Sequence, residues 1–353
     1  YRQSVKRWIL RSAISGLIIQ NLQSKTSKIP MSITWFLLWI IQKTKVVSLK
    51  KIGLLIEQQR ESCVMSANVY KANENTVISF SGGRTSAFML WKVLDAYDGK
   101  LPENIKVCFS NTGKEMPETL DFVKDCQENW GVNIVWLERY AEVAPEDHKN
   151  KYVYETKIVD YKTASRKGEP FAKLLVAKKY APNPVARFCT AELKIRPIKD
   201  YLVRQGWDTP FLAFVGIRAD EQRRAVKMHG KVESGQEIHL PLWLDKITKE
   251  DIYKFWTTHS FDLKLPNNNG TTDWGNCDLC FLKGQSKKLA IIREKPDLAD
   301  WWIEAEENLS KAVGKAAYFR KDNPSYAEMK IIATSQNVLN FGDDETIPCF
   351  CGD

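Results

Sequence analysis

A short strand, a pair of glycines and a helix start follow one another in residues 77–90, VISFSGGRTSAFML, and this junction constrains the fold strongly. The run 77–80 is mostly apolar and begins with two β-branched residues, which is typical of a buried strand, and the residues from Ser86 onward favour a helix. Gly82 and Gly83 allow the tight turn between them. A chain that passes from a buried strand straight into a helix indicates an α/β protein with a parallel sheet.

The same alternation of strand and helix continues along the chain. Further strands are predicted at residues 105–109, 133–137 and 211–216, and helices at 86–97, 117–130, 192–205 and 247–258. Strand–helix–strand repeats at this spacing predict a Rossmann-like, doubly wound parallel sheet. Residues 141–185 are polar and irregular, and we expect a lid-like insertion there. A cysteine-bearing loop is predicted at residues 262–284 and a C-terminal helical region at 286–335.

The net charge of +9 belongs to the first 64 residues. They hold eleven Lys and Arg against two Glu, whereas the remaining 289 residues hold 41 charges of each sign. Overall charge is therefore a poor argument for nucleic-acid binding by the main part of the chain. The apolar stretch 33–41 has about half of the roughly 20 residues that a membrane span needs. We expect residues 1–64 to be an extension outside the functional domain, or else a basic segment that binds a membrane surface or a partner.

Three parts of the chain follow from these patterns. The extension 1–64 precedes a nucleotide-binding domain at residues 65–284, and residues 285–353 form the helical region and a cysteine-containing tail. No convincing signal-peptide cleavage site follows the apolar stretch, so we expect a cytoplasmic protein without a membrane span.

Two loops that follow predicted strands suggest an anion site. Gly82 and Gly83 let backbone N–H groups approach an anion closely, and the helix after them adds its positive end. Hydroxyl groups stand beside them at Ser81, Thr85 and Ser86. Residues 111–113 follow the next strand, and ligands of open α/β sheets bind beyond the carboxyl ends of strands. Neither loop has the spacing of a lysine-containing phosphate loop or of G-x-G-x-x-G, so two ligand-free turns are the alternative.

Arginine side chains follow the strand at 211–216. The segment GIRADEQRRA contains Arg218, Arg223 and Arg224. The guanidinium fork suits phosphate or sulfate, which favours an anion partner, while a solvated charged helix is the alternative.

The cysteines point to metal or redox chemistry. Eight cysteines in 353 residues do not form a disulfide scaffold, and in a reducing compartment a close pair more often binds metal. Cys277 and Cys280 form a C-x-x-C pair, which suits zinc or an iron–sulfur cluster. Further thiols that could join them are Cys189, Cys349 and Cys351.

Taken together, these stretches resemble the phosphoadenosine phosphosulfate (PAPS) reductase family, within the wider PP-loop ATP-pyrophosphatase superfamily of adenine nucleotide alpha hydrolase-like proteins. The matching segments are SGGRTS with S-G-G-x-D-S, NTGKEMPET with D-T-G-x-x-x-P-E-T, CTAELKIRPI with C-C-x-x-x-K, GIRADEQRRA with G-hydrophobic-R, LPLWLDKITKEDIYKFW with P-L-x-x-W-T-x-x-D-V, and CDLC with C-x-x-C. They follow the family's order over about residues 75–284.

The resemblance implies an adenine nucleotide as substrate: PAPS, adenylyl sulfate (APS) or ATP. The residues that would bind it are Ser81, Gly82, Gly83, Arg84, Thr85, Ser86, Asn111, Thr112, Gly113, Arg218, Arg223 and Arg224. The implied reaction belongs to sulfur metabolism: a thiol-dependent reduction of an adenylyl sulfate to sulfite and an adenosine phosphate. Thioredoxin or glutaredoxin would restore the thiol, and a homo-oligomer is compatible with the family.

The resemblance also gives roles to the cysteines. Cys189, Cys277 and Cys280 match three ligand positions of a [4Fe–4S] cluster, and Thr190 stands where a second adjacent cysteine would. The fourth ligand would then be Cys349, and Cys351, followed by glycine, resembles the nucleophile of the reductases' Cys-Gly tail. The two tail thiols could also exchange these roles. Lys194 matches the lysine of the family segment and is the second predicted catalytic residue.

Arg84 and Thr85 occupy the positions where the family loop has its variable residue and its aspartate. The missing aspartate counts against carboxylate-dependent handling of ATP, and so against the first of two alternative functions. The first is a PP-loop ATP pyrophosphatase that activates nucleic acid for sulfur transfer, which would make nucleic acid a partner. The second is a non-catalytic nucleotide-binding protein stabilised by zinc.

Overall fold

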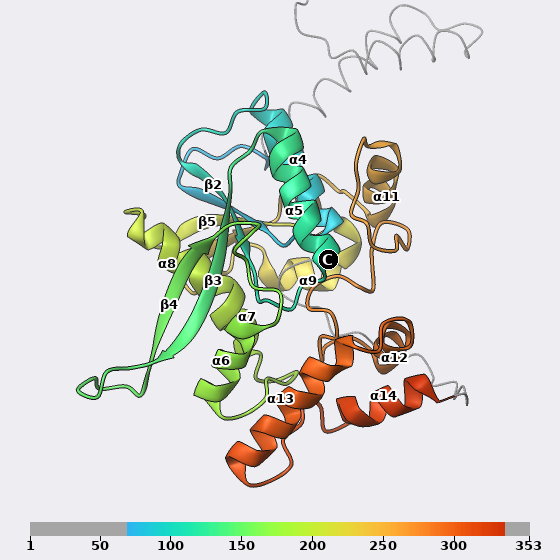
Figure 1. Ribbon diagram of the computed structural model, residues 1–353. Helices are drawn as coiled ribbons and strands as arrows, with labels where there is room; N and C mark the ends of the chain where they lie inside the picture. The colour runs from blue at the N-terminus through green and yellow to red at the C-terminus, as the bar shows by residue number, and fades with distance from the viewer. Residues whose placement is uncertain (1–68, 336–353) are drawn as a thin grey trace, which may run out of the picture. The chain divides into compact units, whose positions relative to one another are not determined.

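The computed structural model describes residues 69–335 (Figure 1). The predictions for residues 1–64 and for the tail thiols Cys349 and Cys351 lie outside this range. No helix within residues 69–335 is long and apolar enough to cross a membrane.

A single seven-stranded sheet forms the centre of the described part, in the order β4-β3-β2-β1-β5-β7-β6. The strands are β1 (Thr76–Phe80), β2 (Ile105–Ser110), β3 (Ile134–Val143), β4 (Tyr152–Val159), β5 (Phe211–Val215), β6 (Val232–Glu233) and β7 (Gln236–His239). The inner pairs are parallel, whereas β4 and β6 pair antiparallel with their neighbours. The predicted α/β fold class is therefore confirmed, with an antiparallel strand at each edge.

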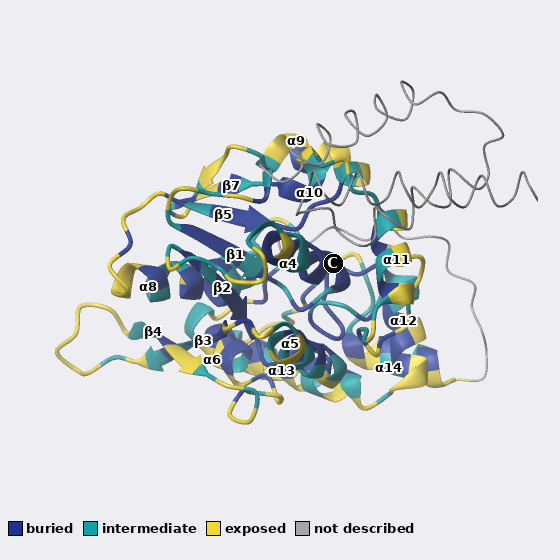
Figure 2. Ribbon diagram, turned by 90° about the horizontal axis from the view of Figure 1, so that it is seen from above, coloured by how far each residue is buried: buried dark blue, intermediate teal, exposed yellow. Residues whose placement is uncertain are grey.

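Helices cover both faces of this sheet. The helical elements of the described part, not all of which touch the sheet, are α4 (Arg84–Ala96), α5 (Pro117–Trp130), α6 (Glu169–Lys178), α7 (Phe188–Thr190), the π-helix η1 (Ala191–Ile195), α8 (Arg196–Arg204), the 3₁₀ turn η2 (Ala219–Glu221), α9 (Gln222–Met228), α10 (Pro241–Leu244), α11 (Lys249–Thr258), α12 (Gln285–Glu294), α13 (Leu298–Val313) and α14 (Tyr326–Thr334). Successive residues of a strand point to opposite faces. Val77 accordingly packs in a cluster with Leu202 of α8, whereas Ile78 packs in the cluster that contains Leu90 of α4 and Phe122 of α5. The central strands are buried on both sides (Figure 2).

The structure corrects the interpretation of residues 141–185 as an irregular insertion. Strand β3 continues to Val143, the antiparallel β4 returns along it, and α6 follows. Only residues 134–137 of β3 pair with β2, so the rest of the β3–β4 hairpin extends beyond the neighbouring strand (Figure 1). Because much of this hairpin is solvated, its residues lack the apolar run by which the central strands were recognised.

The sheet order places three loops at one edge. Strand β1 pairs with β2 on one side and with β5 on the other, so the order of the strands reverses there. The carboxyl ends of β1, β2 and β5 lead into residues 81–83, 111–115 and 216–218. A crevice at such a reversal is where open α/β sheets bind ligands.

The C-terminal helices pack against the cysteine-bearing loop. The hydroxyl of Tyr326 in α14 donates to the carbonyl of Leu279 at 2.6 Å, and Trp302 Nε1 in α13 donates to Asp278 Oδ1 at 2.8 Å. Phe281 stacks on Phe319 with ring centroids 5.9 Å apart. The helical region therefore holds two parts of the C-x-x-C turn: the backbone at Leu279 and the side chain of Asp278.

Candidate functional site

The first glycine loop has the shape of an anion seat. Gly82 has φ of 79°, and a Cβ there would lie 2.7 Å from the Thr119 side chain, so the position requires glycine. Ser86 Oγ accepts from the Ser81 backbone N–H at 3.2 Å and lies 2.9 Å from Ser81 Oγ, which closes the turn. No side chain caps the start of α4. Helix N-termini leave backbone N–H groups that attract anions.

Arg84 turns away from this seat. It is 3% exposed, and its Nε and Nη2 donate to the two carboxylate oxygens of Asp262 at 2.7 and 2.9 Å. Nη2 also donates to the carbonyls of Leu263 and Leu265. The predicted contact between the Arg84 side chain and a nucleotide is not supported by this geometry, because the guanidinium holds residues 262–265 against the start of α4.

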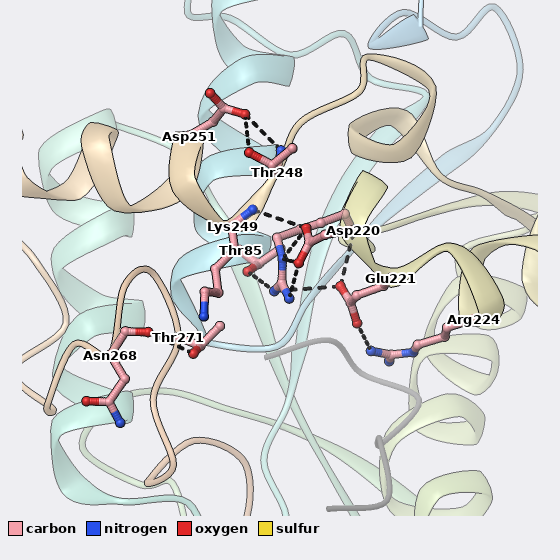
Figure 3. A network of polar contacts seen from close by, with 10 residues as sticks. Thr85, Asp220, Glu221, Arg224, Thr248, Lys249, Asp251, Asn268 and Thr271 are labelled. Atoms are coloured by element: carbon pink, nitrogen blue, oxygen red, sulfur yellow. Dashed lines mark hydrogen bonds and ion pairs between the residues drawn. The ribbon is translucent and has the colours of Figure 1, made fainter.

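Arg218 brings a positive charge to the same loop. Its Nη1 donates to Thr85 Oγ1 at 3.2 Å, and Asp220 and Glu221 lie 3.1 and 3.6 Å from its guanidinium. Figure 3 shows Thr85 on this network beside Asp220, and Glu221 linked onward to Arg224 at 2.7 Å. Thus Thr85, at the aspartate position of the family motif, meets a cation.

The remaining arginine of that segment lies apart from these contacts. Arg223 is exposed on α9, whereas Arg218 is 6% exposed. Of the three predicted arginines, Arg218 contacts the loop directly, and Arg224 is connected to Arg218 through Glu221.

The second loop is shaped by Asn111. Its Nδ2 donates to Glu138 Oε1 at 2.6 Å and to the Ser165 carbonyl at 2.8 Å, and its Oδ1 accepts from the Gly113 N–H at 3.1 Å. Gly113 has φ of 80°, and a Cβ there would lie 2.4 Å from Ser165 Oγ. Asn111 and Gly113 therefore fix the loop's form, and of the three residues predicted here to bind the nucleotide only Thr112 directs its side chain toward the cysteines.

Thr112 joins this loop to the C-x-x-C turn. Its Oγ1 lies 3.5 Å from Cys277 Sγ, and its N–H and hydroxyl reach the carboxylate of Glu115 at 2.8–2.9 Å. Burial raises the pKa of Glu115 and of Cys277, the nearby Glu115 charge raises that of Cys277 further, and the Lys194 ammonium opposes both shifts. Thr112, Glu115, Lys194 and Cys277 thus form one coupled group, defined here as the thiol corner.

Lys194 reaches the thiol corner from the π-helix η1. Its Nζ lies 3.3 Å from Asn276 Oδ1, and its carbonyl accepts from the Ser110 hydroxyl at the end of β2. Cys189 lies in α7, which runs directly into η1, so Cys189 and Lys194 share one short helical segment. π-Turns of this kind occur frequently at functional sites.

The described thiols form only part of a metal-binding set. Cys277 and Cys280 are both buried, in one turn closed by a Cys280 N–H bond to the Cys277 carbonyl at 3.2 Å. Within residues 69–335, however, no three Cys, His, Asp or Glu side chains are grouped so as to hold a metal ion. The described residues therefore offer two clustered donors, with Cys189 outside that group, and the donor set of a four-thiolate cluster is incomplete within them.

Sequence reasoning missed Glu115 and Asp278. Asp278 is 4% exposed, and its carboxylate binds Lys114 at 2.8 Å as well as the Trp302 indole N–H. Its own N–H donates to the Lys114 carbonyl, so the second loop and the C-x-x-C turn run side by side. Both acids lie inside the quoted motifs, NTGKE and CDLC, so a search for acidic residues next to the motif positions would have found them.

A family model of the phosphoadenosine phosphosulfate reductase domain matches residues 75–264. The chain belongs to this family. The uncharacterized nin region protein ORF290 of Escherichia phage lambda is 33% identical over 214 residues, which cover 60% of this chain and 67% of that protein.

Two further similar proteins extend the comparison. The uncharacterized protein MJ0066 of Methanocaldococcus jannaschii is 28% identical over 261 residues, 71% of this chain but only 45% of the archaeal protein. Among solved structures, the U34-tRNA thiolase NcsA from Methanococcus maripaludis with its [4Fe-4S] cluster covers 73% of this chain and 77% of its own, with 14% identity and a TM-score of 0.38.

Proposed function

We propose that the protein binds an adenylyl sulfate at the two glycine loops and reduces its sulfur to sulfite by a thiol-dependent reaction. The observation that carries this proposal is the contact between Thr112 Oγ1 and Cys277 Sγ. It supports a site in which cysteine chemistry takes place at a bound nucleotide, because Thr112 belongs to a loop at the sheet edge where ligands bind.

In this proposal the α4 N-terminus and Arg218 receive the 5′ phosphate or sulfate group. The Cys351 thiolate attacks the sulfur, the sulfur–oxygen bond to the nucleotide breaks, and the adenosine phosphate leaves. A thioredoxin or glutaredoxin dithiol then displaces sulfite, becomes a disulfide, and restores the Cys351 thiol. Lys194 stabilises negative charge at the reacting group, as a positioned cation can. The exchange needs a reducing compartment, in keeping with the predicted cytoplasmic location.

The reaction is tested by sulfite release from PAPS and from APS in the presence of thioredoxin. We expect sulfite and one adenosine phosphate in equal amounts, and loss of turnover in Cys351→Ser but not in Cys63→Ser, whose thiol lies in the N-terminal extension. Pyrophosphate release from ATP, with no sulfite from either sulfonucleotide, would instead establish the pyrophosphatase alternative and refute the reductase.

We further propose that Cys277 and Cys280 hold an iron–sulfur cluster together with Cys349 and with Cys189, which in the described structure lies outside the group of Cys277 and Cys280. Burial raises the pKa of the Cys277 thiol, and a bound cation would offset this by stabilising the thiolate. Anaerobically purified protein should then be brown, and Cys277→Ser should remove both the colour and the iron. A colourless protein with stoichiometric zinc would contradict the cluster and favour the zinc-stabilised alternative.

A further inference from the structure

The charge of the main part of the chain is divided between two regions, although it sums to zero. Residues 149–199 carry thirteen Lys and Arg against four Asp and Glu, a net +9. The other residues of 65–353 carry 28 against 37, a net −9. The basic segment comprises the end of the β3–β4 hairpin, α6, and the stretch through α7 and η1 into α8. Overall neutrality therefore conceals a strongly basic segment, of the kind that attracts polyanions.

Aromatic rings lie among these cations. Lys178 Nζ lies 5.5 Å from the ring centre of Tyr154 and 5.8 Å from that of Phe188, and Tyr180 packs edge-on against Phe188 at 4.8 Å. Tyr180 is 46% exposed. We name this set, with the exposed Lys179 that precedes Tyr180, the basic–aromatic surface. A ring and an ammonium a few ångströms apart match the base and the phosphate of one nucleotide.

Exposed apolar side chains are also frequent in this part of the chain. Half of the twelve large hydrophobic side chains exposed in the described residues belong to residues 143–203, namely Val143, Ile158, Val176, Tyr180, Val185 and Val203. If a second copy of this chain bound through the same segment, two segments of net charge +9 would face each other. The charge therefore favours a partner of opposite sign.

The basic–aromatic surface leads to the thiol corner. Phe188 is followed directly by Cys189, and α7 continues through η1 to Lys194. Lys178 links the surface to η1 as well, because it pairs with Glu192 at 2.9 Å. A chain bound along β4 and across Phe188 would therefore arrive at the segment that carries Cys189.

We propose that the basic–aromatic surface binds single-stranded nucleic acid. The cations of the surface meet the phosphates, Tyr154, Tyr180 and Phe188 stack on unpaired bases, and the strand runs toward Cys189. Single strands suit this surface better than duplexes because their bases are free to stack. The inference concerns binding alone and holds whether or not the protein reduces a sulfonucleotide.

The experiment measures the anisotropy of fluorescein-labelled 20-nucleotide single strands of DNA and RNA with the full-length protein, and compares two double variants of equal charge. Tyr154→Ala with Tyr180→Ala should weaken binding at least fivefold, since one stacked base contributes about 1–3 kcal/mol. Tyr154→Phe with Tyr180→Phe keeps the rings and should bind like the wild type. The labelled strand annealed to its complement should bind more weakly than the single strand.

Two charge-reversal variants distinguish binding by the basic–aromatic surface from binding by positive charge elsewhere, including that of residues 1–64. Lys179→Glu should flatten the slope of log K against log salt by about 0.7, the value for one lost phosphate contact. Lys254→Glu makes the same change of net charge on α11 and should leave the slope unchanged.

Several results would overturn the proposal. Equal slopes in the two charge variants, or wild-type affinity in the alanine pair, would each do so. Binding of polyglutamate as tight as that of the oligonucleotides would assign the surface to an acidic protein instead.

Discussion

Replacing Asp278 with alanine is expected to lower the free energy of unfolding by about 3–5 kcal/mol, because it breaks a buried ion pair from one side. The carboxylate accepts from the Lys114 ammonium at 2.8 Å, the Trp302 indole at 2.8 Å and the Leu279 N–H at 2.6 Å. Without it, the Lys114 charge stays buried with no counter-ion in this contact. Urea unfolding followed by far-ultraviolet circular dichroism measures the change.

The matched control for this variant lies on the same loop. Asp273 pairs with Lys287 at 2.7 Å, but both side chains are more than a third exposed. Asp273→Ala should therefore cost less than about 1 kcal/mol. If the two alanine variants unfold within 1 kcal/mol of each other, Asp278 does not hold the C-terminal helices to the C-x-x-C turn in the way that we infer.

The central sheet could be predicted because its strands are buried on both faces. The runs at 77–80 and 105–109 consist of apolar or β-branched residues with few interruptions, and both became strands. The same rule failed for the hairpin of β3 and β4, where solvent reaches the strands and polar residues replace the apolar run. The strands β6 and β7 were not predicted, because two and four residues are too few to show the two-residue hydrophobic period of a strand.

The candidate site was predictable as a set of loops but not as a set of side-chain contacts. The position of Gly82 follows from the strand-to-helix turn, which any sequence reading can recognise. The direction of Arg84 does not, because its partner Asp262 is 178 residues away and no local pattern links them. Likewise, Asn111 has the residue type of a ligand contact, yet long-range bonds to Glu138 and Ser165 commit its amide to the loop.

Replacing Lys194 with methionine is expected to slow sulfite release about 100-fold while it weakens nucleotide binding less than tenfold. Removing one preorganised electrostatic contact to the transition state typically costs 10²–10³ in rate. The charge of Lys194 reaches both Glu115 and Cys277, the acid and the thiol of the thiol corner. The measurement is a comparison of kcat for sulfite release with the Kd of the sulfonucleotide by calorimetry.

Two further variants show whether a slower release of sulfite is due to the loss of the Lys194 charge. Lys194→Arg keeps the charge and should recover part of the rate, because the guanidinium also stabilises an anion. Lys199→Met removes a lysine from the adjoining α8 and should leave kcat within about threefold of the wild type, because Lys199 lies outside the thiol corner. If Lys194→Met raises Kd as much as it lowers kcat/KM and leaves kcat unchanged, Lys194 only binds the nucleotide. Lys194 would then not stabilise the transition state of the cysteine reaction.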